Sequence, residues 1–264
     1  MAKKRPKFLG GNGIIGMVHL KPLPGSPRGG VDFNEIYRQA FQDGLTLKKG
    51  GVSALLVENY GDAPFLKNKV EPHVVGALSI VAYHLKEKTG LPVGVNCLRN
   101  DCISSMGAGA CSGASFIRVN VFSGVIVTDQ GIIEGCAGEL LRYRRILGAR
   151  VKVLADVNVK HGVPLAQMDP ILSAVETVER GLADALILTG PATGTPVDMD
   201  ILERTRKALP RVPLIVGSGV NPENIKDILG VADGVIVGTY FKEDGKIEKP
   251  VDIERVRDLV NSLM

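Results

Sequence analysis

Two stretches decide the fold of this chain: LIVGSG at residues 214–219 and VIVGT at residues 235–239. In each, an apolar run typical of a buried strand ends in a glycine turn. Glycine lets a backbone approach a ligand closely, and amides at a strand end or helix N-terminus can point at an anion. Two such turns in consecutive strand–helix units are typical of the late-loop phosphate site of a (β/α)8 barrel. The pattern predicts phosphate binding by Gly217, Ser218, Gly219, Gly238 and Thr239.

These glycines have a plainer interpretation, because they also permit tight turns. Phosphate binding is favoured over it because Ser218 and Thr239 place hydroxyl donors at matching positions of the two units, which turn geometry alone would not require.

Eight short apolar runs alternate with helical patterns, which favours parallel βα units over a sandwich or a helical bundle. Their starts are about 30 residues apart, as expected for a barrel of ~250 residues with eight units. An open doubly wound sheet is disfavoured, because the G-x-G at residues 11–13 precedes the first strand instead of following it. We therefore expect an α/β fold, a phosphate-binding (β/α)8 TIM barrel, as a single domain over residues 1–264. The predicted strands are 14–18, 54–57, 93–96, 116–119, 151–157, 185–188, 214–216 and 234–237.

Local signals between the strands predict helices and two functional loops. Helices are expected to start at Asp169-Pro170, at Asn221-Pro222 and at Asp252. The connections at 21–34 and 121–139 are long, and loops of that length usually serve as lids or covers.

Composition excludes several classes of protein. The chain has 264 residues, 45% of them apolar and 23% charged, as in an ordinary globular protein. The net charge of +4 is mild, the basic residues near the N-terminus at 3–7 are typical of a solvated end, and aromatic residues make up only 5%. No nucleic-acid partner is expected.

The sequence contains no apolar segment of the length that crosses a bilayer, and no signal peptide follows the basic start. A cytoplasmic location is expected. The four cysteines show no CxxC spacing, so a structural zinc or iron–sulfur site is disfavoured.

Chemistry in barrels of this kind occurs at the C-terminal ends of the strands, so polar residues there are the candidates. Side chains alternate along a strand, so Arg118 and Asn120 share a face, as do Asp156, Asn158 and Lys160 if that strand continues. Pointing outward would bury charge beneath the helices, so we expect these groups in the barrel mouth. The candidates are His19, Glu58, Asn59, Asn96, Arg99, Arg118, Asn120, Asp156, Asn158, Lys160, His161, Thr189 and Thr193.

Four of these residues are candidate catalytic groups: His19, Glu58, Asp156 and Lys160. Asp156 or Glu58 could act as a general base if a partly dry site raises the carboxyl pKa, or could form a structural salt bridge with Arg118 or Lys160. Lys160 could form a Schiff base if desolvation lowers its pKa, although charge pairing is the simpler role. His19 could move protons, bind a metal or be structural.

A divalent metal is left open, with His19, Glu58, Asp156 and His161 as its ligand set, because no His-x-His follows the first strand. No other cofactor is indicated. Asn96, Arg118 and Asn120 would orient substrate oxygens and stabilise developing negative charge, with Arg99 and Thr189 as further substrate contacts.

Several strings together resemble the BtpA family, which includes SgcQ-like proteins. They lie at residues 18–27, 94–101, 116–120, 128–131, 141–144, 155–161, 237–239, 242, 244–245 and 250–252. The resemblance implies a phosphate-binding barrel, and a family named for a role in photosystem I biogenesis whose members also resemble enzymes of sugar or nucleotide metabolism. It makes 128–131 a candidate lid or interface in which Asp129 meets the substrate; an acidic turn cap is the plain alternative.

We expect an enzyme, a lyase, isomerase or glycosyl-bond hydrolase, that acts on a phosphorylated sugar or nucleotide-like metabolite. The alternative is a non-catalytic assembly factor for a membrane complex such as photosystem I, which predicts an exposed apolar patch outside the mouth. A phosphometabolite sensor is a third interpretation. A homo-oligomer, formed through the outer helices or the long first loop, is also left open.

Overall fold

Eight parallel strands close into a barrel in the computed structural model, which describes residues 5–30, 32–166, 168–190, 192 and 194–263. The closed order is β1-β11-β10-β9-β7-β4-β3-β2. These strands are β1 (Ile14–His19), β2 (Ala54–Glu58), β3 (Val93–Asn96), β4 (Phe116–Val119), β7 (Lys152–Val157), β9 (Ala185–Leu188), β10 (Leu214–Val216) and β11 (Gly234–Val237). The predicted barrel is confirmed, and each predicted strand end lies within one residue of the observed end.

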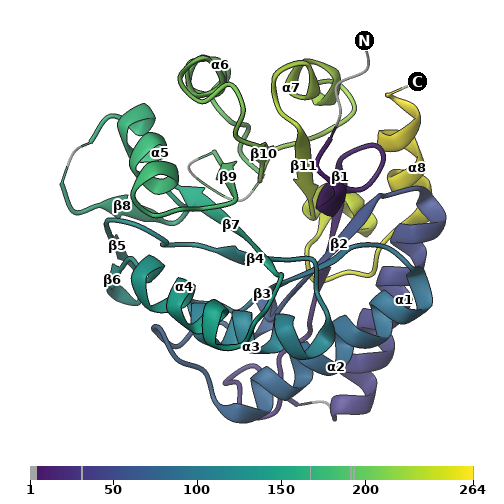
Figure 1. The fold of residues 1–264 in the computed structure, drawn as a ribbon. Helices are drawn as coiled ribbons and strands as arrows, with labels where there is room; N and C mark the ends of the chain where they lie inside the picture. The colour runs from purple at the N-terminus through teal and green to yellow at the C-terminus, as the bar shows by residue number, and fades with distance from the viewer. Residues whose placement is uncertain (1–4, 31, 167, 191, 193, 264) are drawn as a thin grey trace.

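Helices surround the barrel (Figure 1). They are α1 (Phe33–Gly50), α2 (Pro72–Thr89), α3 (Cys102–Ser112), α4 (Ala137–Ile146), α5 (Pro170–Glu179), α6 (Met199–Ala208), α7 (Ile225–Val231) and α8 (Ile253–Asn261). Short 3-10 helices are η1 (Lys7–Leu9), η2 (Tyr60–Asp62), η3 (Thr239–Phe241) and η4 (Glu243–Gly245).

Two of the three predicted helix starts are confirmed, because Asp169 caps α5 and Asp252 caps α8 through their side chains. The third was predicted too early. Asn221 and Asn224 exchange backbone-to-side-chain hydrogen bonds of 2.9 and 3.0 Å across a turn, so α7 begins only at Ile225.

Alternation along the strands decides where hydrocarbon ends and the polar mouth begins. In β1, Met17 belongs to the apolar cluster inside the barrel and His19 follows on the same face; in β7, Leu154 precedes Asp156 in the same way. The same spacing sets Glu58, Arg118, Thr189, Gly217 and Gly238 at the mouth. Leu9 of η1 packs into the cluster and Phe8 packs against it.

A small antiparallel sheet, which the sequence analysis did not predict, lies outside the barrel. Its strands are β5 (Val125–Thr128), β6 (Gly131–Glu134) and β8 (Gly162–Pro164), in the order β6-β5-β8. They come from the connections after β4 and β7, and Figure 1 shows them at one side of the molecule near α4 and α5. Part of the long 121–139 connection is therefore a β-hairpin with Asp129 and Gln130 at its turn.

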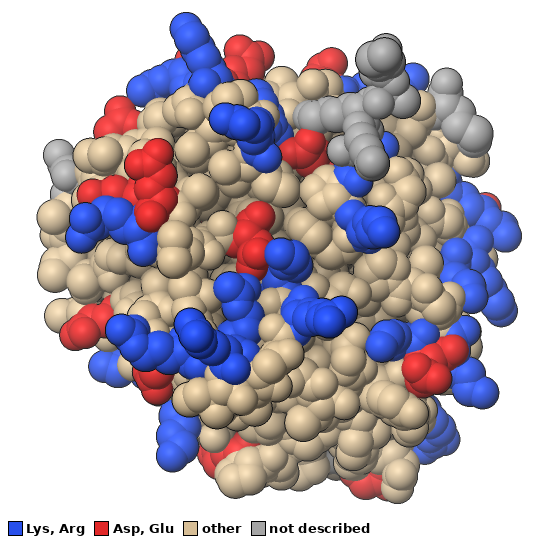
Figure 2. All heavy atoms as spheres, viewed as in Figure 1, with Lys and Arg blue, Asp and Glu red and all other residues tan. Residues whose placement is uncertain are grey.

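Surface charge is mixed on the face drawn in Figure 2, where basic and acidic side chains are interspersed among neutral ones. In the part of the chain that the structure describes, no helix combines the length and the apolar character needed to cross a membrane.

Candidate active site

A cavity of about 600 Å³ opens at the C-terminal ends of the barrel strands. Met17 and Ile236, from the apolar cluster inside the barrel, are among its lining residues. Most of the predicted site residues also line it: His19, Glu58, Arg99, Arg118, Asn120, Asp129, Lys160, His161, Gly217, Ser218, Gly219, Gly238 and Thr239. Asn96, Asp156 and Thr189 are not in its lining, although Asn96 and Asp156 bond to residues that are. Thr193 lies outside the described residues.

The glycines of the turns after β10 and β11 are required for different physical reasons. A Cβ on Gly219, whose φ is +67°, would lie 2.4 Å from the backbone of Pro196, so tight packing explains this glycine. A Cβ on Gly238 would lie 2.9 Å from Cε1 of His19, a residue of the cavity. Among the described residues, none accepts a hydrogen bond from the backbone amides of Gly219, Gly238 or Thr239. These amides are therefore available to a ligand.

The predicted use of the Ser218 hydroxyl as a phosphate donor is wrong. Its Oγ accepts a hydrogen bond from the amide of Gly190 at 2.7 Å and donates its own to the carbonyl of Thr195 at 2.9 Å. The hydroxyl proton is therefore used to fasten the loop after β9.

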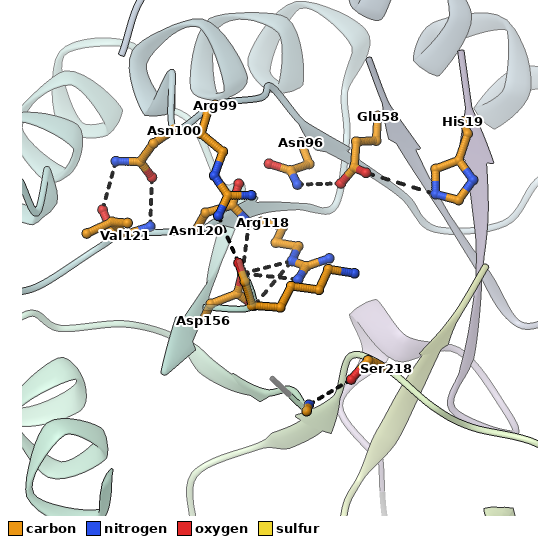
Figure 3. Close-up of polar contacts among 12 residues, drawn as sticks. His19, Glu58, Asn96, Arg99, Asn100, Arg118, Asn120, Val121, Asp156 and Ser218 are labelled. Carbon is orange, nitrogen blue, oxygen red and sulfur yellow. Dashed lines mark hydrogen bonds and ion pairs between the residues drawn. The ribbon is translucent and has the colours of Figure 1, made fainter. Parts of the chain in front are cut away.

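Arg118 and Asp156 form a buried ion pair at the barrel mouth. The Arg118 guanidinium donates through Nε and Nη2 to the Asp156 carboxylate at 3.1–3.2 Å, and Asn120 Nδ2 donates to Oδ2 at 2.8 Å (Figure 3). Burial alone would lower the pKa of Arg118, but the charge of Asp156 raises it above its ordinary value. Sequence analysis left two roles open for Asp156, a general base and a structural salt bridge, and the geometry supports the salt bridge.

Glu58 lies between Asn96 and His19 (Figure 3). Asn96 Nδ2 donates to Glu58 Oε2 at 2.6 Å, and Oε1 lies 3.9 Å from His19 Nε2. Burial, with the nearby cations Lys242, Lys160 and Arg118, lowers the pKa of His19 well below its ordinary value. His19 is therefore neutral at physiological pH, and Glu58 faces the cavity with one oxygen held by an amide.

Lys160 reaches the cavity, but not by continuing the strand alternation. The strand ends at Val157, and Asn158 has a φ of +52° and lines a second cavity of about 210 Å³. The prediction that Asn158 shares the mouth is therefore wrong. Among the described residues, none hydrogen-bonds the Lys160 amine or lies within ion-pair distance of it, so its expected charge pairing is absent. Burial and the neighbouring Arg118 lower the pKa of Lys160 to about 8.

Arg99 is 5% exposed and approaches this region from the loop after β3. Its Nη2 donates to the backbone carbonyl of Lys160 at 2.9 Å, and Figure 3 shows the side chain extending toward Arg118 and Asn120. The main effect on the pKa of Arg99 is burial, which lowers it.

Asp129 lines the cavity from the β5–β6 turn, so the predicted loop does reach the mouth.

The residues proposed as metal ligands do not form a cluster. His19 and Glu58 are 3.9 Å apart, whereas Asp156 is bonded to Arg118 and Asn120. Over the described ranges, no group of three or more His, Cys, Asp and Glu side chains is placed to hold a metal ion. The hypothesised set of His19, Glu58, Asp156 and His161 is therefore not supported.

Sequence reasoning missed several cavity residues that lie outside the strand ends, in loops, short 3-10 helices and α8: Arg28, Tyr60, Asn221, Tyr240 and Arg255. Arg28 lies in the long first connection, the one signal that could have found it. Arg255 is a helix residue; its Nε donates to the Tyr240 carbonyl at 2.6 Å, and the guanidinium lies 4.6 Å from the ring centroid of that tyrosine. No local pattern marks it.

Unpartnered polar atoms gather at the mouth. The large majority of buried polar side-chain atoms in proteins have a hydrogen-bond partner. Among the described residues, six such atoms lack a partner, and four belong to residues at the strand ends or in the loop after β3: His19 Nδ1, Arg99 Nε, Asn120 Oδ1 and Thr189 Oγ1. Their concentration at one end of the barrel is what a binding site for a polar ligand requires.

Solved structures of low sequence identity share this fold. Phosphoribosyl anthranilate isomerase of Thermus thermophilus superposes with a TM-score of 0.58 at 13% identity, over 95% of this chain and 97% of that one. A KDPGal structure gives 0.56 at 13% identity, over 95% and 93%.

Relatives of higher identity match over almost the whole length. An uncharacterized protein of Pyrococcus furiosus is 48% identical over 95% of both chains. The photosystem I biogenesis protein BtpA of Synechocystis is 44% identical, over 96% of this chain and 88% of its own. SgcQ, an sgc region protein of Escherichia coli, is 32% identical, over 95% and 93%. The BtpA family model matches residues 11–264, and the chain therefore belongs to the BtpA family.

Proposed function

We propose that this protein is an enzyme that transfers protons within a phosphorylated sugar-like or nucleotide-like metabolite. One observation carries the proposal: a single cavity of about 600 Å³ is bordered by the amides of the two late turns and by Glu58, His19 and Lys160. The volume lies within the usual range of small-molecule sites. An anion anchored at one side would thus lie beside groups able to exchange protons.

The phosphate end is formed by the turns after β10 and β11. The amides of Gly219, Gly238 and Thr239 are available there. Several amides without partners suit a phosphate, because its charge is shared among fixed donors. In the named isomerase relative of the fold, the substrate is likewise phosphorylated, as its name states.

Proton transfer is assigned to Glu58 and Lys160. Glu58 would act as the base, since Asn96 fixes one of its oxygens and the residue lines the cavity. Lys160, with a pKa of about 8, can exchange a proton near neutral pH and would act as the acid. Neutral His19 would donate or accept a hydrogen bond, while Arg118, positioned by Asp156 and Asn120, would stabilise negative charge that develops on the substrate.

Lyase, isomerase and glycosyl-bond hydrolase chemistry all use this set. Proton abstraction beside a carbonyl, followed by stabilisation of the oxyanion, serves the first two classes. Protonation of a leaving oxygen by Lys160, with water activated by Glu58, serves the third.

A ligand screen with two matched glycine variants tests the proposal. Sugar phosphates and nucleotides that bind the folded protein should raise its melting temperature. Gly238→Asp places a carboxylate and extra volume at the anion site, so it should abolish the shift. Gly230→Asp, at an exposed position where a Cβ would have no atom within 4 Å, should retain it. The proposal fails if no phosphorylated compound stabilises the protein or if Gly238→Asp binds like the parent.

Glu58→Gln separates binding from chemistry. Once a substrate is found, this variant should bind it with unchanged affinity and lose turnover by about a hundredfold or more. Equal turnover would remove Glu58 from the mechanism.

A second candidate function, assembly of a membrane complex, is favoured by an apolar patch. Ile132, Val127 and Val163 are cross-strand neighbours on the small sheet, and all three are exposed, Val163 by 68%. Exposed apolar side chains that lie together commonly mark interaction sites. The patch could equally mediate the homo-oligomer left open by the sequence.

Complementation distinguishes the two functions. In Synechocystis lacking its own BtpA, an assembly role predicts that Glu58→Gln restores photosystem I and that the double variant Ile132→Lys and Val163→Lys does not. An enzymatic role predicts the reverse. Sedimentation of the double variant would show whether the patch joins copies of this chain.

A further inference from the structure

The two ends of the cavity lie on opposite sides of the barrel. In the closed strand order, β10 is four places from β3 and β11 is four places from β4, which is the greatest separation that eight strands allow. The glycine turns follow β10 and β11, whereas Arg99 follows β3. A ligand with its phosphate on the late turns therefore extends across the mouth toward Arg99.

That far side holds cationic groups that lack matching anions. Arg99 is buried, and its Nε has no hydrogen-bond partner among the described residues. The neighbouring Lys160 amine makes no ion pair with any residue the structure describes. Of the nearby carboxylates, Asp156 is bound by Arg118 and Asn120, Glu58 is bonded to Asn96, and Asp129 is exposed on the hairpin turn.

The position of Arg99 is fixed by its loop. Asn59 bonds both the amide and the carbonyl of Leu98, at 2.7 and 3.3 Å. Asn100 does the same to Val121, at 2.7 and 3.0 Å, as Figure 3 shows. The Arg99 amide also donates to the carbonyl of Leu66 at 3.2 Å. Burying a guanidinium in a loop held this firmly is costly unless an anion meets it there.

We propose that the substrate carries a second anionic group, a carboxylate or a second phosphate, at the end opposite its phosphate, and that Arg99 binds that group. A planar guanidinium suits either anion because it can offer two parallel donors. The inference rests on the proposed function, since the phosphate on the late turns sets the direction of the ligand.

Two pairs of compounds test it by calorimetry at pH 7. Glucitol 6-phosphate and 6-phosphogluconate differ at the far end by a carboxylate, and fructose 6-phosphate and fructose 1,6-bisphosphate differ there by a phosphate. In at least one pair, the protein should bind the member with the anionic far end about tenfold more tightly or better. The pair that shows the preference identifies the kind of anion.

Variants locate the preference. In Arg99→Gln it should fall to about twofold or less, while affinity for the monophosphate of that pair stays within about twofold of the parent. Arg99→Lys, which retains the charge, should keep part of the preference. Arg150→Gln, at an exposed arginine that does not line the cavity, should keep all of it. Urea unfolding of each variant checks that it is folded.

The outcomes separate this inference from the proposed function. Equal affinity for both members of both pairs overturns the second anion site and leaves phosphate binding intact. A preference that persists in folded Arg99→Gln overturns the role of Arg99. If none of the four compounds binds, the proposed function fails and this inference fails with it.

Discussion

The two sides of the barrel mouth consist of different chemical groups. On the side of β10 and β11, the site consists of glycine turns and backbone amides, and its shape is set by close contacts such as that between Gly219 and Pro196. On the side of β3, β4 and β7, it consists of charged side chains, among which Arg118 and Asp156 form a buried ion pair. Substitutions on the first side should act through sterics, and those on the second through charge.

Asp156→Asn should have the largest effect. It leaves the Arg118 charge buried without a counter-ion, which in proteins costs about 3–5 kcal/mol. The free energy of unfolding, measured in urea, should fall by that order. Asp169→Asn, which neutralises an exposed partner of Arg204, is the matched control and should change little. A small decrease in the free energy of unfolding of Asp156→Asn would mean that the side of β3, β4 and β7 does not depend on charge.

Gly219→Ala tests the steric side. Its positive φ costs a residue with a Cβ about 1–2 kcal/mol, and overlap with the Pro196 backbone adds about 1–3 kcal/mol. The free energy of unfolding of Gly219→Ala, measured in urea, should therefore fall by the sum of the two costs. Gly230→Ala, in α7 with open space around it, should be neutral or slightly stabilising. Equal stability of the two variants would contradict the steric account.

Lys160 should make stability depend on pH. Its pKa is about 8 in the folded protein against an ordinary 10.5, so between these values the unfolded chain binds more protons. Stability should therefore rise with pH from about 8 to 10.5, by at most about 1.4 kcal/mol per pH unit from this group. Unfolding of the parent and of Lys160→Met across this range isolates the contribution, which must be absent from the variant. Parallel curves would show that the amine is not desolvated.

Asp129→Asn should have the smallest effect. Burial lowers the pKa of Arg99, and the exposed carboxylate of Asp129 offsets part of that effect. Removing this negative charge should strengthen binding of an anion at the far end by about twofold. Calorimetry with 6-phosphogluconate measures the change. Asp227→Asn, at an exposed site on α7, controls for net charge and should leave the affinity unaltered. Weaker binding in Asp129→Asn would indicate that this carboxylate contacts the ligand directly.

Much of the barrel could be predicted because its strands are continuous apolar runs, buried on both faces. The alternation within them also identified the mouth residues, since Arg118 and Asn120 do share a face and both contact Asp156. That rule stops where the strand stops: after Val157 the backbone turns through a positive φ, and Asn158 leaves the mouth.

Other features depended on contacts that no local pattern reveals. The small sheet has strands of only three or four residues, and its pairing joins segments from two separate connections. The Ser218 hydroxyl is engaged by Gly190 and Thr195, which are distant in sequence. Arg255 reaches the cavity from a helix where nothing in the neighbouring residues distinguishes it from a surface arginine, and for Arg28 the length of the first connection was the only signal.

The hairpin of β5 and β6 sets the rim of the cavity without contributing a strand to the barrel. Because exposed loop tips tolerate insertions and deletions, residues added or removed at its Asp129-Gln130 tip should leave the eight barrel strands and their interior unchanged. Under the proposed function, a longer or shorter tip should therefore change the size of substrate that the cavity admits while the residues at the strand ends stay in place.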